Sequence, residues 1–127
     1  MKTRLLTLIP ALAGLCLAIP LATATPAAAQ GSACVNLLVG AGYAAKIRVV
    51  WSGGSTDWTG SFPIGKSKCV PLTGVPQGAT FSTELKAILG KTITCTPSDI
   101  VYNPSVPQNV VYNAWGTTLS PKCEEPN

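Results

Sequence analysis

The 127-residue chain contains no histidine, and this absence has the widest consequences for function. Without an imidazole there is no Ser-His-Asp or Cys-His catalysis, no histidine metal site and no ordinary acid–base group for neutral pH. Carboxylates are also scarce and are limited to Asp57, Glu84, Asp99, Glu124 and Glu125. A glycosidase needs two carboxylates facing each other across a cleft, and no motif supports Asp57 and Asp99 in that role. The sequence therefore predicts a protein that is not an enzyme, needs no cofactor and holds no metal ion.

Motifs that bind nucleotides, phosphate or calcium are missing as well. The chain has no GxxxxGK, GxGxxG, EF-hand or GxSxG pattern, and residues 60–67 end in Gly-Lys-Ser without the spacing of a phosphate loop. Beyond the first 29 residues there are seven basic and five acidic side chains, a formal net charge of +2. This balance is too small to predict a nucleic-acid partner or attraction to an anionic membrane.

The first 29 residues have the composition of a signal peptide. Lys2 and Arg4 precede an almost wholly apolar run over residues 5–22, and three consecutive alanines then offer a cleavage site. Two prolines interrupt the run and no stop-transfer charges follow it, so we expect cleavage and no stable membrane insertion afterwards. Residues 30–127 would then form a single secreted or periplasmic domain.

Four cysteines lie beyond the signal segment: Cys34, Cys69, Cys95 and Cys123. An even number of cysteines in a short exported domain predicts two disulfides. A zinc site is not predicted, because the cysteines lack the short paired spacings that such sites use. Four cysteines allow three pairings, and the sequence alone does not choose among them. We favour Cys34–Cys69 and Cys95–Cys123, because each would tie a hairpin-sized segment to its neighbour.

Strand-like segments separated by turn residues recur about every ten residues, which is typical of an all-β sandwich or barrel. The clearest alternation lies in residues 43–51, where one face carries Ala45, Ile47, Val49 and Trp51 and the other carries Lys46, Arg48 and Val50. In residues 109–115, Val110, Tyr112 and Ala114 oppose Val111, Asn113 and Trp115. We predict a small antiparallel β-sandwich, immunoglobulin-like or similar, stapled by two disulfides.

Residues 79–91 fit two interpretations. As a helix, Phe81, Leu85, Ile88 and Leu89 would share one face. As a strand, Phe81, Thr83, Leu85 and Ala87 would point inward, and a turn at Gly90 would lead into a second strand. We favour the strand, because the surrounding segments are all β. The polar end of the chain is expected to be a tail fixed to the domain by Cys123.

Aromatic side chains near glycine-rich turns are the candidates for ligand binding. Trp58 follows Asp57 beyond a Gly-Gly turn, and Trp115 closes the last strong strand after Tyr112. An exposed indole with hydrogen-bonding neighbours can stack on a sugar ring or insert into a partner protein. We therefore predict that Trp58, Asp57, Trp115 and Tyr112 bind the ligand.

A rigid scaffold with recognition loops predicts an exported, non-catalytic binding or interaction domain. Its partner is expected to be a glycan or a protein of the cell envelope or the environment. The alternative is a secreted inhibitor or effector that blocks another protein's active site, because pre-organised loops lose little entropy on binding.

Overall fold

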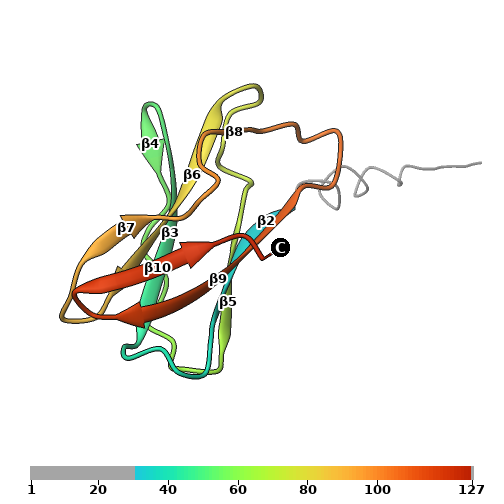
Figure 1. Cartoon of the computed structure of the whole chain (residues 1–127). Helices are drawn as coiled ribbons and strands as arrows, with labels where there is room; N and C mark the ends of the chain where they lie inside the picture. Colours follow the sequence, from blue (N-terminus) through green and yellow to red (C-terminus); the bar gives the residue numbers. More distant parts are fainter. Residues whose placement is uncertain (1–30, 127) are drawn as a thin grey trace, which may run out of the picture.

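The computed structural model describes residues 31–126, which form two β-sheets packed face to face (Figure 1). The signal segment predicted over residues 1–29 lies outside the described residues. Nine strands and no helix occur within residues 31–126, so this part of the chain has no helix that is long and apolar enough to cross a membrane. The predicted all-β sandwich is confirmed.

One sheet contains four strands in the order β10-β9-β2-β5, with bounds Ser120–Glu124, Asn109–Thr117, Ser32–Leu37 and Ser67–Pro71. The other contains five strands, β4-β3-β6-β7 with β8 also on β6, with bounds Gly54–Ser55, Ala45–Trp51, Thr80–Ala87, Thr92–Thr94 and Ile100–Val101. Neighbouring strands are antiparallel except for β2 and β9, which run parallel over six residue pairs.

Strict alternation along the strands builds the core between the sheets. In β3, Ala45, Ile47 and Val49 are fully buried, whereas Lys46 and Arg48 point to the outer face. In β9 the buried set is Val110, Tyr112 and Ala114. Because successive side chains of a strand point to opposite faces, this pattern gives each sheet one apolar face to bury and one polar face for water.

The ambiguous segment is a strand, as we favoured. β6 pairs with β3 over seven residue pairs on one side and with β7 and β8 on the other, so its backbone groups are satisfied from both sides. Phe81, Thr83, Leu85 and Ala87 point into the core. A helix here would leave the backbone of β3 without this partner, and the sheet pairing therefore outweighs the helical spacing of the apolar residues.

The end of the chain is more ordered than the expected polar tail. Residues 120–124 form strand β10, which pairs with β9 and turns Pro121 and Cys123 into the core. Sequence reasoning missed this strand because its outward residues are all polar. The disulfide Cys95–Cys123 connects the five-stranded sheet, just after β7, with β10 of the other sheet.

Both favoured disulfide pairings are confirmed. Cys34 and Cys69 are bonded across directly paired positions of β2 and β5, on the outer face of the four-stranded sheet. Cys95 and Cys123 are buried between the sheets. Two such bonds in a domain of this size indicate an oxidising environment.

Candidate functional site

Trp115 lies on the outer face of the four-stranded sheet, near the end of β9. Because Tyr112 and Ala114 are turned inward, Asn113 and Trp115 are necessarily turned outward. The indole is 37% exposed, which is unusual for so large an apolar group. β10 adds its own outward residues to this face, with Lys122 opposite Trp115 and Glu124 opposite Asn113. An aromatic ring, an amide, a cation and a carboxylate thus share one surface.

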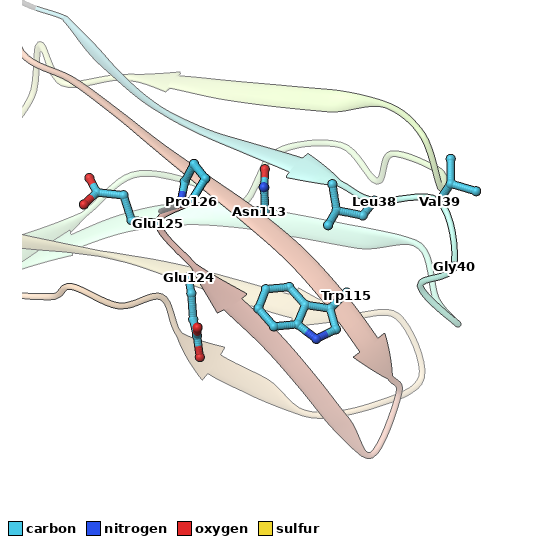
Figure 2. Close-up of a pocket in the computed structure, with 8 residues that line it drawn as sticks. All are labelled: Leu38, Val39, Gly40, Asn113, Trp115, Glu124, Glu125 and Pro126. Carbon is cyan, nitrogen blue, oxygen red and sulfur yellow. The ribbon is translucent and has the colours of Figure 1, made fainter.

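A groove of about 540 Å³ opens on this surface (Figure 2). Its lining residues are Leu38, Val39, Gly40, Asn113, Trp115, Glu124, Glu125 and Pro126. In the close-up, the Trp115 ring and Leu38 lie toward one end, and Glu125 and Pro126 lie toward the other. The groove therefore combines a flat apolar surface with carboxylate and amide groups, which is the usual composition of a small-molecule or sugar site.

Hydrogen bonds hold the groove in its shape from beneath and beside it. The hydroxyl of Tyr43 donates to the Trp115 carbonyl oxygen at 2.7 Å, and the Leu38 amide donates to the Ala114 carbonyl at 2.9 Å. The Asn36 side-chain amide donates to Oδ1 of Asn113 at 3.1 Å. No residue among 31–126 accepts a hydrogen bond from Nδ2, the side-chain nitrogen of Asn113, so this donor is available to a ligand.

Trp58 lies on the other sheet and is engaged with charged neighbours. The guanidinium carbon of Arg48 lies 4.5 Å from the centre of the Trp58 ring, and the Lys86 ammonium lies 5.9 Å from it. Arg48 also forms an ion pair with Glu84, with 2.8 Å between Nε and Oε1. One face of the indole is thus covered by a cation of the same chain, and the half-buried ring stabilises the outer face of β3 and β6.

Asp57 does not line the groove at Trp115. It lines a second hollow of about 410 Å³ between the edges of the two sheets, together with Trp51, Thr56 and Thr59. The hydroxyls of both threonines accept hydrogen bonds from the backbone of β3, from Val49 and Ile47 respectively. They therefore serve mainly to hold the segment after β4 against the edge of the sheet.

Tyr112 is fully buried, and its hydroxyl donates to the Pro97 carbonyl oxygen at 2.9 Å. Burial raises the pKa of this phenol above its ordinary value. Tyr112 is therefore a core residue and forms no part of an exposed surface.

Of the four predicted ligand-binding residues, only Trp115 lies in the larger groove, and Trp58 is on the opposite sheet. Leu38, Glu124 and Glu125 were missed as groove residues. The alternation of β9 placed Asn113 beside Trp115, but the position of β10, and with it Glu124, was not visible from the sequence. No group of three or more Cys, Asp or Glu side chains able to hold a metal ion occurs among the described residues.

Comparisons with known proteins define no family for this chain. No protein-family model and no curated protein sequence matches it. Among solved structures, pneumolysin is similar with a TM-score of 0.44 and 16% identity over 76% of this chain and 23% of that protein. Listeriolysin O gives 0.45 and 17%, over 76% of this chain and 22% of its own length. Intermedilysin, solved with human CD59, gives 0.41 and 16%, over 76% and 24%. The chain thus spans less than a quarter of these proteins, and we take neither family nor function from the likeness.

Proposed function

We propose that this protein is an exported, non-catalytic domain that binds a saccharide in the groove beside Trp115. The observation that supports this most directly is the partly exposed indole in a groove that also contains Asn113 and Glu124. The C–H groups of a pyranose ring pack well on the flat face of an indole, and its hydroxyls need donors and acceptors at the rim. The side-chain nitrogen Nδ2 of Asn113 supplies a hydrogen-bond donor, and the Glu124 carboxylate supplies acceptors.

Rigidity of the groove favours binding. Asn113, Trp115 and Glu124 of the groove lie on the paired strands β9 and β10, and the backbone at Trp115 is held by the Tyr43 hydrogen bond. A site on paired strands loses little conformational entropy when a ligand arrives. The two disulfides favour an extracellular or periplasmic location, and the saccharides that the protein would meet there include the glycans of the cell envelope.

Saccharide binding is tested with the matched pair of variants Trp115→Ala and Trp58→Ala. Purified protein is screened against cell-envelope polysaccharides by affinity electrophoresis, and the hits are measured by isothermal titration calorimetry. We expect Trp115→Ala to weaken binding at least about tenfold, because the stacking surface is lost. Trp58→Ala is expected to leave the affinity within about twofold, since that indole lies on the other sheet. Equal losses in both variants, or no saccharide bound by the unsubstituted protein, would refute the proposal.

The absence of catalysis is tested on the same ligands. We expect no turnover of a bound saccharide over long incubation, and no change in that result when Asp57 and Asp99 are replaced by Asn. Turnover that disappears in this double variant would show a hydrolase instead. An inhibitor or effector function stays a prediction, and inhibition assays with secreted hydrolases address it separately.

A further inference from the structure

Four loops meet at one end of the sandwich, which we call the loop end. They are residues 38–44, 63–66, 88–91 and 118–119, and they lie in the lower part of Figure 1. Backbone hydrogen bonds join two pairs of these loops directly, from Lys91 to Thr118 and from Ile88 to Ala44, each at 2.9 Å. Two more connect a loop with the end of a strand: Gly42 to Gly116 of β9 at 2.9 Å and Gly65 to Leu37 of β2 at 2.7 Å. The loop end is therefore one connected platform, although its segments are far apart in the sequence.

Each of these loops exposes an aliphatic side chain. Leu89 is 96% exposed, Val39 88%, Leu119 70% and Ile64 45%. Leu89 also has a backbone φ of 63°, a conformation that residues with a side chain rarely adopt and that Gly or Asn would adopt with less strain. Four aliphatic groups in water at one end of a small domain are not explained by folding, and such surfaces mark interaction sites.

Four lysines belong to these loops or adjoin them in sequence. Lys66 and Lys91 belong to the loops themselves, and Lys46 and Lys86 occupy the adjoining positions of β3 and β6, directly opposite each other. Like charges at paired positions repel each other, so an approaching anionic surface would lower the electrostatic energy of Lys46 and Lys86. None of the described carboxylates belongs to these loops, although Glu84 lies two positions before Lys86 on β6, and Glu124 and Glu125 line the same groove as Val39.

We propose that the loop end docks on the surface of an anionic lipid bilayer. The four aliphatic groups stand on four different loops, and of the four only Val39 lines the groove at Trp115. Separate tips suit a fluid surface, into which each side chain can sink on its own between headgroups. The lysines in and next to these loops match negatively charged headgroups, which attract nearby cations. Docking is peripheral, with Leu89, Val39 and Leu119 reaching the boundary between headgroups and acyl chains.

Composition could not reveal this site. A net charge of +2 spread evenly over the domain would not attract a membrane, but the strand order places four lysines in or next to the four loops, and no described carboxylate belongs to those loops. Docking goes beyond the proposed saccharide site, although the groove reaches Leu38 and Val39 and so opens beside the docked end. Vesicles without sugar headgroups test docking alone.

The test uses the chain from Gln30 to Asn127, which contains all nine described strands and both disulfides. Binding is measured by co-sedimentation with vesicles of phosphatidylcholine alone and of phosphatidylcholine mixed with phosphatidylglycerol. We expect binding to the mixed vesicles, weak or no binding to phosphatidylcholine alone, and loss of binding as salt is raised, because salt screens the lysines.

Two double variants test whether binding depends on the aliphatic side chains of the loop end or on exposed aliphatic side chains anywhere on the surface. Leu89→Asn with Leu119→Ser is expected to weaken binding at least about tenfold, because two leucines leave the interface. Asn suits the positive φ at position 89, so this variant should fold as well as the original chain, which its thermal denaturation checks. The matched control is Val101→Ser with Val106→Ser, which removes two aliphatic groups of 59% and 53% exposure at the opposite end of the sandwich. The control should stay within about twofold of the unsubstituted protein.

Three outcomes would overturn the proposal. The first is no binding of the unsubstituted protein to mixed vesicles, and the second is equal weakening in the two double variants. The third is self-association in sedimentation velocity that the Leu89→Asn, Leu119→Ser variant abolishes, without vesicle binding, which would make the loop end an interface between copies. Saccharide affinity measured on the same variants is independent, because it depends on Trp115 and Asn113.

Discussion

The buried hydroxyl of Tyr43 lies 2.7 Å from the carbonyl oxygen of Trp115 and donates a hydrogen bond to it. This contact ties the loop between β2 and β3 to the end of β9, at the residue whose side chain faces the groove. It therefore connects the stability of the fold with the geometry of the proposed saccharide site.

Replacing Tyr43 by Phe should lower stability without disturbing the packing of the ring. The Trp115 carbonyl would lose its phenol donor, at a cost of about 1 kcal/mol. For a domain of this size the melting temperature should fall by about 4–8 °C, measured by circular dichroism. The matched control is Tyr102→Phe, because the buried Tyr102 hydroxyl has no hydrogen-bond partner among the described residues. That variant should be as stable as the original chain or more stable, and an equal loss in both would contradict the assigned role of the Tyr43 bond.

Stability should fall in alkaline solution. Burial raises the pKa of both Tyr43 and Tyr112, so the folded chain holds the phenol protons more tightly than the unfolded chain. The resulting stabilisation is complete below the unfolded pKa of about 10 and is lost as the pH rises through the higher folded pKa values.

Urea denaturation at a series of pH values between about 8 and 11 measures this loss. In the double variant Tyr43→Phe, Tyr112→Phe, the free energy of unfolding should depend less on pH over that range, whatever its absolute value. An unchanged slope would show that other groups control the alkaline transition.

The two disulfides should differ in accessibility to reductant. Cys69 is exposed, whereas Cys95 and Cys123 are both buried. A mild thiol under native conditions should therefore open Cys34–Cys69 first, as measured by alkylation and mass spectrometry over time. Simultaneous opening of both bonds would indicate that reduction follows global unfolding instead.

Removing either disulfide by Cys→Ala pairs should cost about 2–4 kcal/mol. The sequence separations are 35 and 28 residues, and the loop-entropy contributions then differ by only about 0.2 kcal/mol. We expect the larger loss for Cys95–Cys123, because its removal also leaves a void between the sheets. Chemical denaturation of the two variants ranks them, and a larger loss for Cys34–Cys69 would contradict this prediction.

Reversing one charge of the Lys46–Lys86 pair should stabilise the domain. The two lysines occupy directly paired positions of β3 and β6, so Lys86→Glu replaces a repulsion by an attraction. The expected gain is at most about 1 kcal/mol and should vanish at high salt, because the Lys86 side chain is exposed. The double variant with Lys46→Glu and Lys86→Glu restores like charges and should lose the gain. Thermal denaturation at low and high salt measures all three chains.

Local patterns were sufficient for the faces of the main strands. The alternation in residues 43–51 identified the buried residues Ala45, Ile47 and Val49 of β3, and that in residues 109–115 separated the two faces of β9 without saying which is buried, because period two is a property of the extended backbone itself. The cysteine count predicted two bonds, and hairpin-sized spacing favoured the correct pairs. The segment over residues 79–91 could be assigned only from its neighbours, since its apolar residues fit both periods.

The candidate site was predicted only in part. Trp58 and Trp115 have similar local surroundings, with polar and small residues on each side. The sheet order separates them onto opposite outer faces, where Arg48 covers one ring and a groove opens at the other. Tyr112 was grouped with Trp115 by proximity in sequence, although its position in the alternation turns it into the core.

By itself the sequence determined which residues alternate, that the chain has no histidine to act as an acid, base or metal ligand, and that four cysteines beyond the signal segment could be bonded in pairs. Only the tertiary structure decided that β10 completes the groove at Trp115, and that aliphatic tips and lysines from distant loops meet at one end. The reason is physical: periodicity and composition are local, whereas a surface is assembled by strand order and register, which bring turns from all parts of the chain together.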